Sequence, residues 1–251
     1  MPDTDFAISP DIAEARQLDV TSNGHPVPTM LWLPKSGLSP IPLVMVGHGG
    51  GGHKQAPTVL KMARGLAEEY GIATLAIDGP VNGDREANNE DARRIRQQDR
   101  NAYRRMFYME KYSEMVDDWR AALDVALALP ELAGAPVGYW GLSMGTRFGV
   151  PTIVAEPRIR AAVIGLFGYR EGAETNQRVY DDLPKLDVPI LFVQQLSDEE
   201  VSQGAYHEFF KRIGTDDKRL HANPGRHAEV PKSELIASRL FLARKLKAIP
   251  E

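Results

Sequence analysis

Short apolar runs alternate with amphipathic stretches over most of the 251-residue chain. Ile41–Gly47 and Ala73–Ile77 are apolar almost throughout, which is typical of strands that are buried on both faces of a sheet. Between them, apolar residues recur at helical spacing over Pro57–Tyr70. The alternation predicts an α/β protein with a mostly parallel central sheet and helices on both of its faces.

The same alternation continues through the second half of the chain. The strands predicted there are Val137–Leu142, Ala161–Phe167, Val188–Val193 and Lys218–Ala222. The helices predicted there are Tyr112–Leu129, Thr146–Glu156, Glu199–Ile213 and Pro231–Ala248.

The beginning of the chain has a different pattern. Ala15–Val20 and Val27–Leu33 are extended segments on either side of Asn23-Gly24, a dipeptide typical of tight hairpins. We therefore expect an N-terminal antiparallel hairpin. No internal repeat or low-complexity linker interrupts the chain, so residues 1–251 are predicted to form one domain.

Composition excludes several classes of protein. The chain has no cysteine, which rules out disulfides, thiolate zinc sites and a cysteine nucleophile. A net charge of −4 with scattered Lys and Arg gives no indication of nucleic-acid or membrane-surface binding. Met1–Pro10 lacks a basic start followed by an apolar stretch, and no run of 18 apolar residues occurs, so we expect a cytoplasmic protein outside the membrane.

A candidate nucleophile lies in the run Gly141-Leu142-Ser143-Met144-Gly145. The pattern G-x-S-x-G is typical of a serine on a sharp turn between a strand and a helix, where larger residues on either side of the turn would collide. The predicted strand before Ser143 and the predicted helix after it supply that context. A tight turn without chemistry is the alternative.

A serine hydroxyl needs a histidine to accept its proton, and the histidine needs an acid to orient it. Asp198 follows the predicted strand Val188–Val193, and His227 follows Lys218–Ala222. The order serine, acid, histidine is the order expected on an α/β-hydrolase sheet. Ser143, Asp198 and His227 are therefore the predicted catalytic triad.

Each partner of the serine has rivals in the sequence. Glu199 and Glu200 are alternative acids, and Asp198 in a solvated helix cap is the non-catalytic alternative. Among the other histidines, His25 falls in the hairpin, His207 in a helix and His221 in a strand. His227 is preferred because it lies in a loop after a strand.

Glycines occupy positions 49–52, directly after the strand that ends at Gly47. Such a loop lets backbone N–H groups approach a substrate and stabilise the oxyanion of a tetrahedral intermediate. We expect the N–H of Met144 as one donor and that of Gly50, or else Gly51, as the other. The alternatives are a flexible hinge and a phosphate-binding loop, although no Gly-Lys-Ser/Thr follows the glycines.

Polar residues replace the regular pattern over residues 81–111. A long polar insertion beside a site is often a lid or a substrate-binding wall, and the alternative is a solvated surface helix. The candidate substrate contacts are Arg85, Tyr103, Phe107 and Tyr108 in this stretch and Tyr169 after another strand.

With these residues the chain resembles the α/β-hydrolase superfamily, and within it the dienelactone-hydrolase-like and prolyl-oligopeptidase-like esterases. The resemblance extends from about Leu43 to Ala248 and includes His48-Gly49, Asp78-Gly79-Pro80 and Pro224-Gly225-Arg226-His227. It implies a serine esterase that forms an acyl-enzyme and needs no metal or organic cofactor. Dienelactone hydrolases themselves carry a cysteine nucleophile, and this chain has Ser143 instead.

We therefore expect hydrolysis of a small to medium carboxylic ester. The same site used as a peptidase, amidase, thioesterase or acyltransferase is the nearest alternative, and a non-catalytic protein that binds a small ligand is another. The oligomeric state stays open, a homo-oligomer included.

Overall fold

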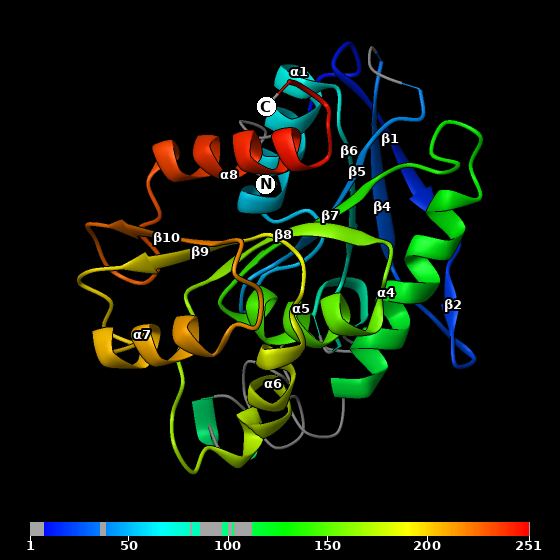
Figure 1. Cartoon of the computed structure of the whole chain (residues 1–251). Coiled ribbons are helices and arrows are strands. Elements are labelled where there is room, and N and C mark those ends of the chain that lie inside the picture. Colours follow the sequence, from blue (N-terminus) through cyan, green and yellow to red (C-terminus); the bar gives the residue numbers. More distant parts are fainter. Residues whose placement is uncertain are drawn as a thin grey trace.

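The computed structural model of the chain describes residues 8–35, 39–80, 82–85, 97–99, 102 and 112–250. Across these residues an eight-stranded sheet runs through the molecule in the order β1-β4-β6-β5-β7-β8-β9-β10 (Figure 1). Its strands are β1 (Ala13–Leu18), β4 (Thr29–Pro34), β5 (Leu43–Gly47), β6 (Ala73–Ile77), β7 (Val137–Leu142), β8 (Ile159–Gly165), β9 (Ile190–Gln195) and β10 (Lys218–Asn223).

The sheet is mostly parallel, as the pattern predicts. β6, β5, β7, β8, β9 and β10 pair in parallel, whereas β4 is antiparallel to both β1 and β6. β5, β6 and β7 are buried at every residue, which explains why their sequences are apolar without alternation. β10 is the edge strand beside β9, and its residues are half-buried or exposed.

Helices cover both faces of the sheet. Figure 1 shows α1 and α8 on one face, in contact with each other, and α4, α5, α6 and α7 on the other. The helices are α1 (Pro57–Tyr70), α4 (Tyr112–Leu127), α5 (Met144–Ala155), α6 (Gln177–Asp182), α7 (Gln203–Arg212) and α8 (Lys232–Lys245). None of the helices in the described ranges combines the length and the apolar character that a bilayer crossing requires.

The predicted N-terminal hairpin is present. β1 pairs antiparallel with β4, and the chain between them forms a small second hairpin of β2 (Thr21–Ser22) and β3 (His25–Pro26). Asn23 and Gly24 both have positive φ, as a two-residue hairpin turn requires. Figure 1 shows this β2–β3 hairpin beside α4.

The largest error in a predicted helix boundary is at the start of α7. The helix expected from Glu199 begins at Gln203, because Ser202 acts as its N-cap and its side chain accepts a hydrogen bond from the N–H of Ala205. The residues before Ser202 form a turn in which the Asp198 carboxylate accepts two backbone N–H groups instead. The later start of α7 leaves Glu199 and Glu200 in the same loop as Asp198.

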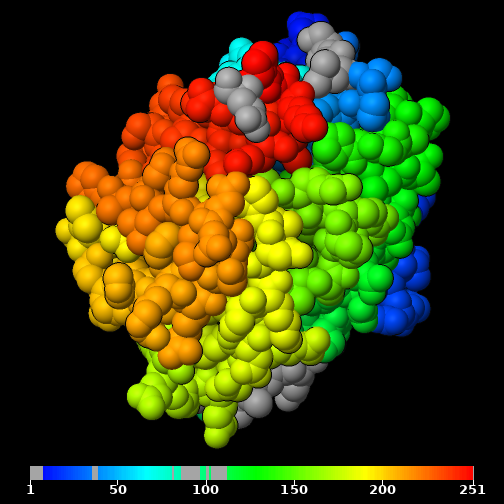
Figure 2. Space-filling view, in the orientation of Figure 1, coloured from blue at the N-terminus to red at the C-terminus, as the bar shows by residue number. Residues whose placement is uncertain are grey.

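The topology places three loops at one edge of the sheet. β7, β9 and β10 run parallel, so the loops after them share the carboxyl edge of the sheet. Ser143 follows β7, Asp198 follows β9 and His227 follows β10. In Figure 2 the segments after β9 and β10, coloured yellow to orange, adjoin one another on the surface.

Candidate active site

Ser143 lies on a strained turn between β7 and α5. Its φ of 58° and ψ of −113° lie outside the regions that residues with a side chain normally adopt. A Cβ on Gly145 would lie 2.9 Å from the carbonyl oxygen of Gly47, and one on Gly141 would lie 2.9 Å from that of Gly145. Glycine is therefore required at both places, for the steric reason that the motif predicts.

Hydrogen bonds from the core hold this turn in place. The Ser143 N–H donates to the carbonyl of Gly165 on the neighbouring β8 over 2.9 Å. The hydroxyl of the fully buried Tyr139 donates to the carbonyl of Gly145 over 2.7 Å. The Thr146 hydroxyl lies 2.9 Å from the carbonyl oxygen of Gly141 and accepts the N–H of Gly165 over 2.8 Å. A strained residue costs about 1–3 kcal/mol and persists only where its surroundings fix it in this way.

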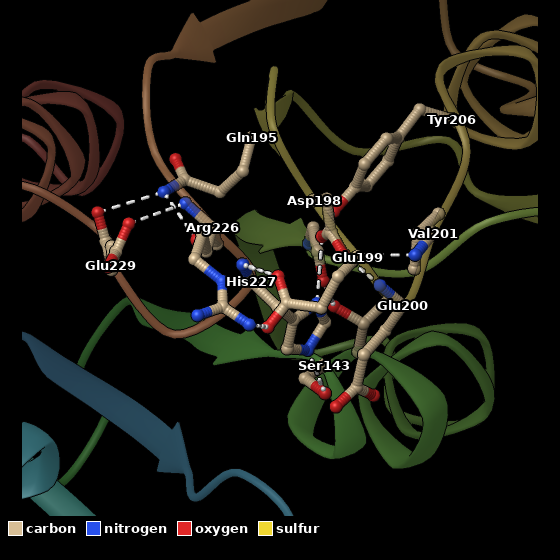
Figure 3. Close-up of polar contacts among 12 residues, drawn as sticks. Ser143, Gln195, Asp198, Glu199, Glu200, Val201, Tyr206, Arg226, His227 and Glu229 are labelled. Atoms are coloured by element: carbon tan, nitrogen blue, oxygen red, sulfur yellow. Dashed lines mark hydrogen bonds and ion pairs between the residues drawn. The ribbon is translucent and has the colours of Figure 1, made fainter.

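The structure brings the three predicted triad residues together (Figure 3). Nε2 of His227 lies 3.0 Å from Oγ of Ser143, and its Nδ1 lies 2.8 Å from Oδ2 of Asp198. The Asp198 side chain is fully buried, and that of His227 is 13% exposed. With the proton on Nδ1 directed at the carboxylate, Nε2 is free to accept the serine proton.

Asp198 is held as a carboxylate by hydrogen bonds to both of its oxygens. Oδ1 accepts the N–H groups of Glu200 and Val201 over 2.7 and 2.9 Å. Oδ2 accepts the hydroxyl of Tyr206 in addition to His227. Burial by itself would raise the pKa of Asp198, but these hydrogen bonds, led by those from Tyr206 and His227, outweigh it and lower the pKa.

The two rival acids make other contacts. Glu199 accepts the backbone N–H of His227 at 2.9 Å and pairs with Arg226 at 3.2 Å. Glu200 donates its backbone N–H to the carboxylate of Asp198. Among the contacts of the described residues, the imidazole ring of His227 therefore meets the carboxylate of Asp198 and not those of its neighbours.

The rival histidines have partners of their own. Nδ1 of His221 lies 3.1 Å from a carboxylate oxygen of Glu234, which belongs to α8. Nε2 of His25 lies 3.3 Å from Oδ1 of Asp118, which belongs to α4. Neither histidine contacts Ser143 within the part of the chain that the structure describes.

The glycine loop after β5 touches the elbow. A Cβ on Gly145 would lie 3.5 Å from the carbonyl oxygen of His48, directly before the glycines. The loop turns at Gly51, whose φ is +76°, and the N–H of Gly52 donates to the carbonyl of Gly49 over 3.0 Å. A Cβ on Gly50 would meet nothing within 4 Å. Open space beside Gly50 is compatible with the predicted approach of a substrate, and the donor roles of Met144, Gly50 and Gly51 stay predictions.

His48 is a residue whose role the sequence did not reveal. Its Nε2 accepts the N–H of Gly79 over 2.9 Å, so Nδ1 carries the proton and donates to the carbonyl of Gly49, also over 2.9 Å. Burial lowers the pKa of His48, which keeps the ring neutral in this arrangement. His48 therefore ties the glycine loop to the turn after β6.

The candidate substrate residues fall into three groups. The side chain of Arg85 is largely buried and its guanidinium donates to Asp118 and Glu114, and its role as a substrate contact stays a prediction. Tyr169 helps to line a pocket of about 540 Å³ beside Asp198, and its role as a substrate contact stays a prediction. Tyr103, Phe107 and Tyr108 lie outside the described residues.

Tyr206 and Gln195 are further residues that sequence reasoning missed. Tyr206 is fully buried on α7, eight residues after Asp198. Gln195 is also fully buried, and its Nε2 donates to the carbonyls of Arg226 and Glu229 on either side of His227. A polar side chain at the end of an otherwise apolar strand, which is the position of Gln195, was the available signal.

Comparison with known proteins places this geometry in context. The model of the dienelactone hydrolase family matches residues 27–225. A cold-adapted esterase from an Arctic intertidal metagenomic library is 33% identical, with a TM-score of 0.80 over 93% of this chain and 94% of its own. No curated protein matches the sequence.

More distant structures share the fold. Est1E from Butyrivibrio proteoclasticus, solved with ferulic acid, is 19% identical with a TM-score of 0.70 over 92% of this chain and 99% of its own. A dienelactone hydrolase from Anabaena variabilis is 18% identical with a TM-score of 0.67 over 96% of this chain and 100% of its own. The predicted α/β-hydrolase fold is thereby confirmed.

Proposed function

The chain belongs to the dienelactone hydrolase family, and from this premise we propose that it cleaves small to medium carboxylic esters through a triad of Ser143, His227 and Asp198. Family membership and the esterase of the same fold make it a carboxylic ester hydrolase. The observation that carries the proposed mechanism is the continuous path from Ser143 Oγ to His227 Nε2 at 3.0 Å and from His227 Nδ1 to Asp198 Oδ2 at 2.8 Å.

Acylation begins with transfer of the Ser143 hydroxyl proton to Nε2 of His227. The oxygen of Ser143 bonds to the ester carbonyl carbon, and the carbonyl electron pair moves to oxygen. The resulting imidazolium is stabilised by the buried carboxylate of Asp198. Backbone N–H groups of Met144 and Gly50, with Gly51 as the second choice, donate to the oxyanion.

Collapse of this intermediate breaks the bond to the alcohol. His227 returns its proton to the leaving alkoxide, and the acyl group stays on Ser143 as an ester. Water then gives a proton to His227 and attacks the acyl carbon. The second tetrahedral intermediate releases the carboxylic acid and restores the Ser143 hydroxyl.

Serine at the nucleophile position sets this chain apart from enzymes of the family that use cysteine. A serine hydroxyl is a weak nucleophile without a base, so the reaction depends fully on the contact with His227. The hydrogen bonds that keep Asp198 ionised support that dependence, because a carboxylate stabilises the imidazolium and a carboxylic acid does not.

The test is a panel of esters of graded acyl length, together with lactones, thioesters and amides, assayed with wild type, Ser143→Ala and Ser233→Ala. Ser233 is an exposed serine on α8 and serves as the matched control. We expect wild type and the control to favour short and medium esters, and Ser143→Ala to lose about 10⁴-fold or more in kcat.

Other outcomes would redirect the proposal. Faster turnover of amides would indicate a peptidase or amidase, and faster turnover of thioesters a thioesterase. Transfer to an added alcohol in preference to water would indicate an acyltransferase. If no substrate in the panel is turned over, or if Ser143→Ala retains most of the activity, the proposed mechanism is wrong.

A further inference from the structure

A second group of polar side chains lies where the β2–β3 hairpin meets α4. His25 comes from β3, and Glu114 and Asp118 come from successive turns of α4. Residues four apart on a helix lie on the same face, so both carboxylates point toward the hairpin. Figures 1 and 2 show the hairpin, coloured blue, against the green helix. The group shares no residue with the predicted triad.

Two atoms of this group are buried and have no hydrogen-bond partner among the residues that the structure describes. They are Nε2 of His25 and Oδ1 of Asp118, and they lie 3.3 Å apart. The Asp118 side chain is fully buried, so water does not solvate this oxygen. An unpaired carboxylate oxygen in such a place costs free energy unless a cation or a donor compensates for it.

The spacing of the atoms fits a metal ion between them. Zn²⁺ binds His nitrogen and carboxylate oxygen at about 2.0–2.2 Å in a tetrahedron, whose ligand atoms lie about 3.3–3.6 Å apart. Nε2 of His25 lies 3.3 Å from Oδ1 of Asp118 and 3.6 Å from Oε1 of Glu114. All three ligand atoms lie within 4.8 Å of one another. These two separations match the edges of a tetrahedron around one ion.

Arg85 also contacts these ligands. Its guanidinium donates to Oδ2 of Asp118 and, over 2.9 Å, to Oε1 of Glu114. This leaves Oδ1 of Asp118 directed at His25, as in metal sites where an outer residue orients a carboxylate ligand.

We propose that His25, Glu114 and Asp118 bind a divalent transition-metal ion of the Zn²⁺ type, with water as the fourth ligand. The His25 side chain is 34% exposed, which gives the ion and the water a route from solvent. The ion would join the hairpin to α4, where Asn23 already donates to Asp117 over 3.1 Å. Its role is structural, because the ligands belong to a different part of the fold from Ser143.

A direct hydrogen bond between His25 and Asp118 is the competing explanation of the 3.3 Å between their side-chain atoms, and the experiment separates the two. Protein treated with a chelator is titrated with ZnCl₂ by calorimetry, and its Tm is measured with and without the ion. We expect one equivalent to bind with a Kd in the micromolar range or below, and saturation to raise Tm by more than about 2 °C. Co²⁺ in its place should give the visible absorption of a tetrahedral site.

Variants decide whether the ion occupies this site. His25→Gln and Asp118→Asn should each weaken binding at least about 100-fold and abolish the rise in Tm. His221→Gln is the matched control, since His221 also faces a carboxylate, that of Glu234, but makes ordinary hydrogen bonds to it. His227→Ala should still bind one equivalent, which excludes the triad histidine as the ligand.

His25 lies in a partly exposed hairpin, so His25→Gln still tests the site even if Asp118→Asn does not fold. Absence of stoichiometric binding to wild type would overturn the proposal and favour the direct hydrogen bond between His25 and Asp118. Binding that survives in His25→Gln would overturn it as well.

Discussion

Oγ of Ser143 lies 3.0 Å from Nε2 of His227, yet the turn that carries the serine and the loop that carries the histidine are built differently. We call these the serine side and the histidine side of the site. Ser143 rests on the apolar core, between buried strands, on a turn that packing holds in a strained conformation. His227 lies in a loop after the edge strand β10, where polar side chains fix its position. The Ser143 turn is held by close packing together with buried hydrogen bonds from the core, whereas the His227 loop is held by polar side chains at the edge of the sheet.

This difference determines how each side should respond to mutation. A packed turn tolerates no added atom, so a single methyl group should displace the nucleophile. A hydrogen-bonded loop has several supports, so the loss of one should weaken catalysis by a smaller factor. A single substitution on the serine side is therefore expected to cause a large loss of activity. A single substitution on the histidine side is expected to cause a gradual, smaller loss.

Among the residues that position Ser143 and His227, the largest effect is expected from Gly145→Ala. The new Cβ would lie 2.9 Å from the carbonyl oxygen of Gly47, which is backbone and cannot move aside easily. A displacement of Ser143 by about 1 Å should lower kcat/KM about 100-fold, and the overpacking should lower the free energy of unfolding by about 1–3 kcal/mol. Steady-state kinetics and chemical denaturation measure the two effects.

Gly204→Ala is the control, because a Cβ at Gly204 on α7 would meet nothing within 4 Å. It should leave both quantities close to wild type. Equal behaviour of the two variants would show that steric fit does not position the serine.

The next effect is expected from Gln195→Leu on the histidine side. Leucine has a similar size but leaves the carbonyls of Arg226 and Glu229 without the donor that now lies 3.0 and 2.8 Å away. We expect kcat to fall about 10-fold and stability to fall by about 1–3 kcal/mol. Gln194→Leu, at the neighbouring half-buried residue, is the control and should change neither.

The serine side and the sheet could be predicted from the sequence because they depend on local patterns. Gly141, Ser143 and Gly145 form a local motif whose steric reason is readable from neighbouring residues, and the parallel sheet followed from strands that are apolar throughout. Asp198 and His227 were predicted from their order together with their positions after predicted strands, because loops after parallel strands share an edge.

Other features depend on contacts between distant segments, which a sequence pattern does not specify. Tyr206 and Gln195 act through side chains that meet Asp198 and the His227 loop only in the folded chain. Arg85 was a candidate substrate contact, and its carboxylate partners come from α4. The start of α7 was misplaced because the Asp198 side chain competes locally for backbone N–H groups.

A smaller effect, with a distinctive pH signature, is expected from Tyr206→Phe. The Tyr206 hydroxyl shares Oδ2 of Asp198 with His227, so its removal leaves more negative charge facing the imidazole. Greater charge favours the protonated ring, and the acid limb of the pH–rate profile should move to higher pH, with kcat about 3- to 10-fold lower.

The stability of this variant should also depend on pH. The pKa of Asp198 is lowered in the folded protein, so its contribution to stability is present above the unfolded pKa and is lost as pH falls through the folded pKa. Tyr206→Phe removes one cause of the lowered pKa of Asp198. The variant should therefore have a smaller free energy of unfolding than wild type at neutral pH, and this difference should shrink as the pH falls. Tyr180→Phe is the control: Tyr180 is buried but donates to the carbonyl of Gly168, so its loss should not move the acid limb.

The smallest effect is expected at Glu199. Its carboxylate accepts the backbone N–H of His227 from an exposed position, so Glu199→Ala should lower kcat only about two- to fivefold. Glu199→Gln keeps an acceptor oxygen and should retain most of the activity. A loss as large as that of Gly145→Ala would contradict the gradual response expected of the histidine side.

The proposed role of Ser143 is tested most directly by a fluorophosphonate, which phosphonylates an activated serine. After reaction, intact-mass measurement and peptide mapping should find one adduct per chain, located on Ser143. The adduct should be absent in Ser143→Ala and should form far more slowly in His227→Ala. A label on another residue, or labelling of wild type no faster than of His227→Ala, would contradict a triad in which His227 activates Ser143.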